Sequence, residues 1–191
     1  SPPTIRLRPS GAARVPAVDV HLAVASKRDV RRYAPGPLPP GAEERILDAG
    51  RLAGSARNRQ PCRFVVAEGD AVRAVARGLY SPANALGAAL VVGVAVTPGG
   101  GLVDFDAGRA AQSMMLAAWA EGVASCPNGI ADRAALEAAL GLAPPERAVV
   151  VLSFGRWDGR DPAGRSAAAW SRRAPRLPLD AVVRRVGGGP A

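Results

Sequence analysis

The sequence predicts an α+β or a small α/β domain. Segments with apolar residues at helical spacing alternate with short, continuously apolar segments that are typical of buried strands. Only three or four such strand segments occur, and there is no internal repeat. With 191 residues, of which 48% are hydrophobic, the chain is long enough to form one domain with a sizeable core.

The N-terminal part of the chain predicts an extended arm followed by two helices. Residues 1–15 combine Pro, Gly and Arg without periodicity, whereas residues 16–27 carry apolar side chains at helical spacing. Four prolines between 35 and 40 exclude helix and predict a stiff connector, although the last of them can open the next helix. The expected buried residues of that second helix are Ile46, Leu47, Gly50 and Ala53.

The rest of the chain predicts three strands and three further helices. The strands are expected at 63–67, 88–96 and 148–154. The helices are expected at 70–77, 104–121 and 132–140, each bounded by turn or capping residues. Between and after them we expect a turn at 81–84, loops at 125–130 and 155–169, and an arginine-bearing tail at 170–186.

Charge and composition exclude several classes of protein. The net charge is +9, but Lys27 is the only lysine, the arginines are spread along the chain, and no nucleic-acid-binding motif is present, so we expect no specific nucleic-acid partner. Two cysteines and one histidine cannot form a disulfide framework or a four-ligand metal site, so no metal is expected. No apolar run has transmembrane length and no signal-peptide pattern is present, which predicts a cytoplasmic protein without a membrane partner.

One candidate site is the polar loop that follows the second predicted helix. Ser55, Asn58 and Gln60 provide a hydroxyl and two amides, which donate and accept hydrogen bonds without titrating. Such groups suit the recognition of a neutral ligand with a polar edge. Pro61 restricts the preceding backbone and so fixes the entry into the next strand. An ordinary solvated turn explains the same residues equally well.

A second candidate site is the basic cluster at 27–32, which includes Lys27, Arg28 and Arg31. Lysine and arginine near a helix end can hold a phosphate, although a solvated helix terminus has the same composition. The sequence has no Ser–His–Asp set, no paired carboxylates with an apolar pocket and no GxxxxGK[ST] loop. The chemistry is therefore expected from a bound cofactor rather than from side chains.

Several motifs taken together resemble the nitroreductase family of FMN flavoproteins. They are Lys-Arg-Asp-Val-Arg-Arg-Tyr at 27–33, Ser-Ala-Arg-Asn-Arg-Gln-Pro at 55–61, Asp-Ala-Gly-Arg-Ala-Ala-Gln-Ser at 106–113, and Glu-Gly-Val-Ala-Ser-Cys-Pro-Asn-Gly at 121–129. The resemblance extends over residues 20–186. It implies a three-layer α+β sandwich with a mixed, mainly antiparallel sheet, formed by one FMN-binding domain over 16–186. It further implies an intertwined homodimer in which the tail 170–186 reaches the partner subunit and FMN lies at the interface.

The resemblance also implies roles for individual residues. The FMN phosphate and ribityl chain would be held by residues of the basic cluster and of the tail, namely Lys27, Arg28, Asp29, Arg31, Arg173 and Arg176. Ser55, Asn58 and Gln60 would lie against the cofactor or the neighbouring subunit. Asn84 would lie by the pyrimidine ring of the flavin. The segment of Pro127, Asn128 and Gly129 would direct a backbone N–H at flavin N5, where a donor stabilises the reduced state without titrating.

The implied activity is that of an NAD(P)H:acceptor oxidoreductase. Hydride would pass from NAD(P)H through flavin N5 to a small quinone, enone or nitroaromatic acceptor in ping-pong order, with no catalytic side chain. Two alternatives stay open: an oxygen-dependent enzyme of the dimethylbenzimidazole-synthase-like branch, for which Asp29 is the hint, and a non-catalytic basic binding module, for which the charge is the only argument.

The sequence also departs from the family pattern. Arg57, Asn58 and Arg59 replace the Gly-Phe of the dimethylbenzimidazole-synthase-like branch, and Cys62 replaces the usual Trp. The segment between Gly78 and Asp104 is short, which predicts a more open pocket.

Overall fold

A computed structural model describes residues 19–157, 167–174 and 176–187. Four strands form one sheet in the order β1 (Cys62–Ala67), β2 (Leu90–Val96), β4 (Arg147–Arg156) and β3 (Val123–Asn128), and every neighbouring pair is antiparallel. The only parallel pairing among the described residues is an isolated bridge between Asp29 and Ser125 at the outer edge of β3. The sheet is therefore mainly antiparallel, as expected.

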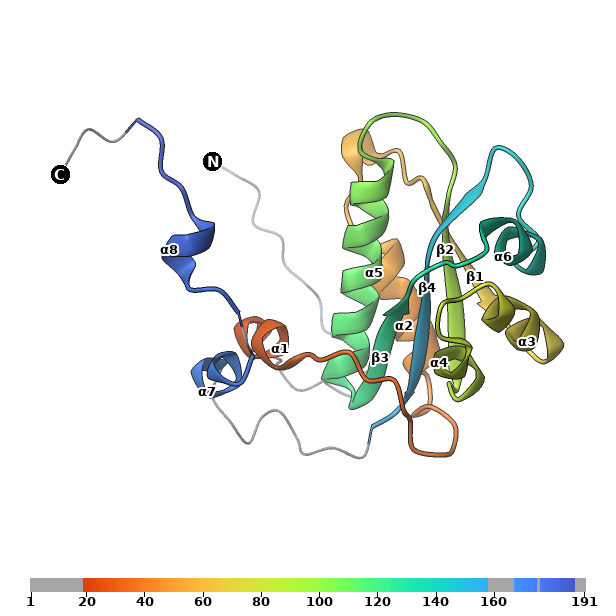
Figure 1. The fold of residues 1–191 in the computed structure, drawn as a ribbon, viewed down its shortest axis with the longest axis horizontal. Coiled ribbons are helices and arrows are strands. Elements are labelled where there is room, and N and C mark those ends of the chain that lie inside the picture. Colours follow the sequence, from red (N-terminus) through yellow and green to blue (C-terminus); the bar gives the residue numbers. More distant parts are fainter. Residues whose placement is uncertain (1–18, 158–166, 175, 188–191) are drawn as a thin grey trace, which may run out of the picture.

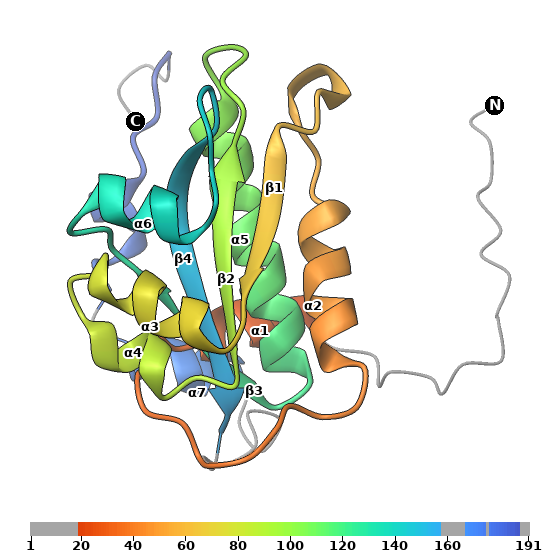
Figure 2. The same ribbon diagram turned by 90° about the vertical axis from the view of Figure 1, so that its right-hand side faces the viewer.

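Helices cover both faces of the sheet and give the three layers that were predicted (Figures 1 and 2). On one face α2 (Ala42–Arg51) and α5 (Val103–Ala120) pack against the sheet around Ile46, Met114 and Phe154, all fully buried. On the other face lie α3 (Asp70–Arg77), α4 (Pro82–Leu86) and α6 (Arg133–Ala139), whose core includes Val75 and Leu136. Strand β2 is buried along its whole length because both faces are covered.

The predicted strands and long helices are confirmed with shifts of one or two residues at most ends, but two predicted irregular segments are regular. The expected turn at 81–84 forms most of helix α4, which begins with Pro82 in its first turn, where the missing N–H has no cost. The expected loop at 125–130 is mostly strand β3. Its register runs from Val123 opposite Arg156 to Asn128 opposite Val151. Pro127 is compatible with this strand because β3 lies at the sheet edge.

Three short helices lie beside the sheet-containing body rather than in it (Figure 1). Helix α1 (Val20–Ser26) begins after Asp19, whose carboxylate accepts from the amides of His21 and Leu22, and it packs against α7 (Ala167–Arg172). Helix α8 (Leu179–Val182) follows α7 and its apolar side chains are exposed. The predicted arm 1–15, the first residues of the helix predicted at 16–27 and most of the loop predicted at 155–169 lie outside the described residues.

No helix within the described ranges combines the length and the apolar character that are needed to cross a membrane.

Candidate functional site

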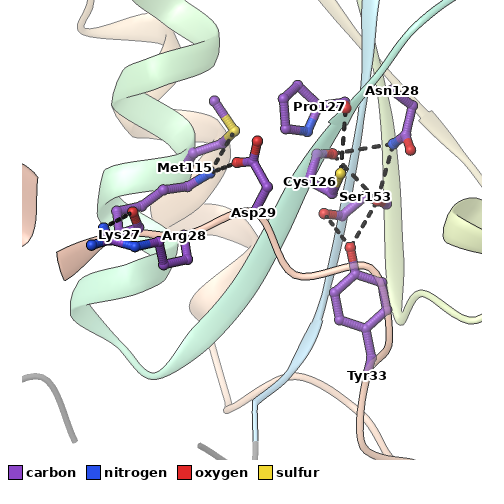
Figure 3. A network of polar contacts seen from close by, with 9 residues as sticks. All are labelled: Lys27, Arg28, Asp29, Tyr33, Met115, Cys126, Pro127, Asn128 and Ser153. Atoms are coloured by element: carbon purple, nitrogen blue, oxygen red, sulfur yellow. Dashed lines mark hydrogen bonds and ion pairs between the residues drawn. The ribbon is translucent and has the colours of Figure 1, made fainter. Parts of the chain in front are cut away.

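The basic cluster lies where the chain leaves α1 and runs beside the edge strand β3. The amide of Val30 donates to the carbonyl of Ser125 over 3.0 Å, which anchors this segment to the strand. The Lys27 ammonium forms an ion pair with the Asp29 carboxylate and lies 3.5 Å from the sulfur of Met115 on α5 (Figure 3). Only 8% of the Lys27 side chain is exposed, so Asp29 compensates a nearly buried cation.

Arg28 joins the basic cluster to the C-terminal tail of the same chain. Its guanidinium donates to the carbonyls of Ala25 (2.7 Å), Lys27 (2.8 Å) and Trp170 (3.1 Å). It also lies 5.6 Å from the centroid of the Trp170 ring, and the Arg173 guanidinium lies 6.0 Å from the same centroid. The structure thus places the guanidinium groups of Arg28 and Arg173 at the same aromatic ring. Arg176 is exposed further along the tail.

A buried network of uncharged polar groups surrounds the end of β3 (Figure 3). The Asn128 amide nitrogen donates to Ser153 Oγ (3.0 Å) and lies 3.1 Å from the carbonyls of Cys126 and Val151. The Asn84 amide donates to Asn128 Oδ1 over 2.9 Å, and the Tyr33 hydroxyl and Ser153 Oγ lie 2.8 Å apart. Asn84 and Asn128 are 7% and 3% exposed, so tertiary contacts fix both amides. No described residue bonds Asn84 Oδ1, which leaves that acceptor for a ligand.

Burial favours the neutral forms of two titratable groups of this network, Tyr33 and Cys126. Burial raises the pKa of Tyr33 to about 12, against the opposing effect of the bond to Ser153. Burial also raises the pKa of the Cys126 thiol, and the nearby Asp29 carboxylate raises it further. A reactive thiolate at Cys126 is therefore disfavoured. The region can position a polar ligand, but it contains no group suited to acid–base catalysis near neutral pH.

Tyr80 is a residue of this region that the sequence did not single out. The amide of Tyr80 donates to the carbonyl of Gly129 over 3.2 Å. The Tyr80 ring lies next to Gly129, since a Cβ added to that glycine would lie 3.1 Å from Cδ2 of Tyr80. The side chain is nevertheless 76% exposed, which makes it an aromatic surface next to the end of β3. Tyr33 and Ser153 were missed as well. Tyr33 ends the motif at 27–33 but was given no role there, and an isolated serine such as Ser153 carries no motif that could have identified it.

The loop 55–60 lies on the other side of the molecule, between α2 and β1. The amide of Ala56 donates to the Asp106 carboxylate on α5, and the amide of Gln60 donates to Ser55 Oγ, both over 2.9 Å. Arg57, Asn58 and Gln60 have φ angles of 53°, 54° and 50°, in the left-handed region that few non-glycine residues adopt. Ser55 thus serves the loop itself, whereas Asn58 and Gln60 are exposed.

A groove of about 790 Å³ runs beside this loop, along α2 and the outer side of β1. Its apolar lining includes Leu47, Pro61 and Phe64, and its α2 rim carries Glu43, Glu44 and Asp48. An acidic rim opposes the binding of a phosphate. Arg51 and Arg63 also line the groove, and Arg51 pairs with Asp48, so Glu43 and Glu44 are the carboxylates of the α2 rim that have no ion pair within the described residues.

One chain does not bring the two candidate regions together. The basic cluster contacts α5 at Met115 and the loop 55–60 contacts it at Asp106. Nine residues of helix separate these positions by about 14 Å along the axis and by about two and a half turns, which places them on opposite sides of α5. Within one chain these contacts therefore do not place the two regions in one compact site.

The basic cluster fits the phosphate of FMN by its chemistry. Lys27, Arg28, Arg31 and Arg32 are cations and Asp29 is an anion, so the cluster carries a net charge of +3, which favours a phosphate monoester dianion. Arg28 directs only its two terminal nitrogens at carbonyls, and Arg31 is exposed, so both retain donors. The buried amides at the end of β3 offer polar groups to a flat heterocycle without adding charge.

Comparison with known proteins identifies the family. The family model described as "Nitroreductase family" matches residues 24–96 and 102–156, more than half of the chain. The chain belongs to the nitroreductase family.

Solved structures share the fold. A nitroreductase family protein of Clostridium difficile 630 superposes with a TM-score of 0.75 at 21% identity, over 88% of this chain and 99% of that chain. A structure of a nitroreductase from Desulfovibrio desulfuricans in complex with FMN gives 0.75 at 25% identity, over 91% of this chain and all of that chain (100%). An NADH dehydrogenase of Thermus thermophilus is 38% identical over 65 residues, 34% of this chain; the match spans only 32% of that relative.

Proposed function

We propose that this protein is an FMN-dependent oxidoreductase that acts as a homodimer. The observation that carries the proposal is the basic cluster of net charge +3 placed next to a neutral, buried amide network at the edge of β3. Membership of the nitroreductase family and the FMN complex of the Desulfovibrio relative support the choice of cofactor. The NADH dehydrogenase name of the Thermus relative supports a nicotinamide donor, NADH or NADPH.

The residues of the first region would hold the cofactor by its two ends. Lys27, Arg28 and Arg31 would bind the phosphate, with Asp29 fixing the Lys27 ammonium and Arg173 or Arg176 adding charge from the tail. The Asn84 carbonyl would accept from the polar edge of the ring system. The backbone of Pro127, Asn128 and Gly129 would lie at flavin N5, where the Tyr33, Ser153 and Asn84 contacts hold it rigid.

The second region would come from the partner subunit. Ser55, Asn58 and Gln60 of one copy would lie against the FMN of the other, because one chain keeps the two regions on opposite sides of α5. The tail supports a shared interface. Leu177, Leu179 and Val182 are 71%, 76% and 61% exposed, and Arg184 and Arg185 follow them. We infer that this basic, apolar tail occupies the acidic, apolar groove along α2 and β1 of the partner.

When bound, FMN supplies hydride-transfer chemistry between NAD(P)H and a small electrophilic acceptor of the quinone, enone or nitroaromatic type, in two successive half-reactions. The residues of this chain orient the ring and keep charge away from it. Burial raises the pKa of both Tyr33 and Cys126, so neither suits proton transfer near neutrality, and protons would come from solvent or substrate.

The test begins with the purified chain and added FMN. We expect a yellow protein that retains FMN through gel filtration, sediments as a dimer and is bleached anaerobically by NADH or NADPH. Arg31→Ala should raise the FMN dissociation constant about 10- to 100-fold, since a charged hydrogen bond contributes about 1.5–3 kcal/mol. Arg77→Ala is the control. It removes an exposed arginine at the C-terminal end of α3 and should leave the FMN dissociation constant unchanged.

A colourless protein that ignores added FMN would overturn the proposal and leave a basic binding module. A flavin that nicotinamides cannot bleach but that oxygen consumes would favour the dimethylbenzimidazole-synthase-like alternative.

A further inference from the structure

The loop 55–60 holds a strained backbone in one fixed shape. Three of its non-glycine residues have left-handed φ angles, a conformation that costs free energy for side chains other than glycine. The bonds from Ala56 to Asp106 and from Gln60 to Ser55 maintain this shape. Strain of this kind persists where the surroundings over-determine the backbone, and it concentrates at functional sites. The loop therefore holds its side chains in fixed positions in addition to connecting α2 to β1.

The arginines of this region differ in whether they are already bonded. Arg51 donates to Asp48 over 2.6 Å, Arg59 donates to the carbonyl of Gly99 over 2.5 Å, and Arg63 donates to the carbonyl of Cys62 over 2.9 Å. Arg57 is exposed and has no hydrogen bond, ion pair or ring contact with any residue in the described ranges. Its rigid backbone thus presents a guanidinium with all five N–H donors available.

The charge around Arg57 favours an anion. No acidic residue occurs between 49 and 67, while four arginines do. The nearby carboxylate of Asp106 is 4% exposed and already accepts from Ala56 and faces Arg109 at 3.6 Å. The loop 55–60 itself therefore carries only positive charge, whereas Glu43, Glu44 and Asp48 of the neighbouring groove lie on α2; positive charge raises the local concentration of negatively charged molecules.

We propose that Arg57 binds an anionic group of the electron acceptor and makes the enzyme selective for acceptors that carry a carboxylate or a sulfonate. The proposal rests on the proposed function, in which this loop of one copy lies against the FMN of the other. A guanidinium suits the task because its planar fork binds a carboxylate or sulfonate through two parallel hydrogen bonds. The side chains of Asn58 and Gln60 are neutral, and Arg59 between them already donates to the carbonyl of Gly99, whereas Arg57 has no such partner among the described residues.

Two acceptors of similar size and different charge test the proposal, for example 4-nitrobenzoate and 4-nitrobenzamide. Their second-order rate constants with the reduced holoenzyme isolate the oxidative half-reaction. Arg57→Asn removes the charge but keeps a residue that tolerates the left-handed backbone. It should lower the rate constant for 4-nitrobenzoate about 10- to 100-fold relative to 4-nitrobenzamide. Arg57→Lys should recover part of the loss, and the control Arg77→Asn should leave the ratio unchanged.

Calorimetric binding to the oxidised holoprotein provides a readout that does not depend on turnover. Benzoate should bind the unmodified protein more tightly than benzamide, and Arg57→Asn should remove that difference. An equal loss for both acceptors would show a purely structural role. A loss confined to NADPH relative to NADH in the reductive half-reaction would show that Arg57 binds the donor's phosphate. Either result, or an unchanged acceptor ratio in flavin-loaded Arg57→Asn, overturns the inference, whereas an unmodified chain that binds no FMN overturns the proposed function.

Discussion

The network around Asn128 and the loop 55–60 are built from similar residues that serve opposite purposes. In the network, the amides of Asn84 and Asn128 are buried and bonded to each other. In the loop, Asn58 and Gln60 are exposed on a left-handed backbone. The amides of the network bond mainly to groups of the same chain and leave only Asn84 Oδ1 without a partner among the described residues, whereas the side chains of Arg57 and Asn58 are exposed and make no bonds there. Residue type alone therefore does not distinguish buried amides that hold one another in place from exposed amides that can contact another molecule. Burial and backbone conformation distinguish them.

The largest effect should come from breaking the buried network. Asn128→Ala removes the donor to Ser153 and leaves the buried Asn84 amide without its acceptor. Each unsatisfied buried group costs about 1–3 kcal/mol, so we expect the free energy of unfolding to fall by about 2–4 kcal/mol. Urea denaturation measures the change.

Asn58→Ala is the matched control in the loop. It removes an exposed amide, and its cost should stay near 1 kcal/mol because only the left-handed backbone opposes alanine there. Similar losses for both variants would contradict the distinction between the two regions.

A smaller effect, dependent on pH, is expected at the edge of the network. Tyr33→Phe deletes the hydroxyl that contacts Ser153 and should cost about 1 kcal/mol below pH 10. Because the folded-state pKa of Tyr33 is about 12, above its usual value of 10, the folded chain binds the phenolic proton more tightly than the unfolded chain. That stability is complete below pH 10 and is lost as the pH rises towards 12.

The measurement is the difference between the unfolding free energies of the unmodified chain and Tyr33→Phe from pH 8 to 12. The difference should shrink above pH 10. A constant difference would mean that the phenol ionises as easily in the folded protein as in the unfolded one, and a widening difference would mean that it ionises more easily in the folded protein.

The sequence predicted those parts of the fold that depend on continuous patterns. Strand β2 was predictable because burial on both faces requires an unbroken apolar run. Strand β3 was not, because its polar residues are typical of a loop, and the partners that bury Asn128, namely Asn84 and Ser153, come from distant segments. The basic cluster was visible because its residues are contiguous, whereas its contact with Trp170 joins segments that are 142 positions apart.

The loop 55–60 shows the same limit. Its polar composition was evident, but its left-handed backbone depends on Asp106, which lies 50 positions from Ala56. Long-range contacts of this kind cannot be inferred from local residue preferences.

The smallest expected effect has the opposite sign and tests the strain directly. Gln60 has a φ of 50°, and its side chain makes only a long bond of 3.5 Å to the carbonyl of Asn58. Gln60→Gly should relieve a left-handed penalty of about 1–2 kcal/mol while adding about 0.4–1 kcal/mol of unfolded-state entropy. A net stabilisation of a few tenths to about 1 kcal/mol should follow.

Gln112→Gly, at an exposed position inside α5, should instead destabilise by about 0.5–1 kcal/mol because glycine weakens a helix. Opposite shifts in the urea midpoint would confirm that the loop stores strain. If Gln60→Gly is instead destabilised, the backbone around Gln60 is relaxed. The hydrogen bonds within the loop would then be enough to account for its shape.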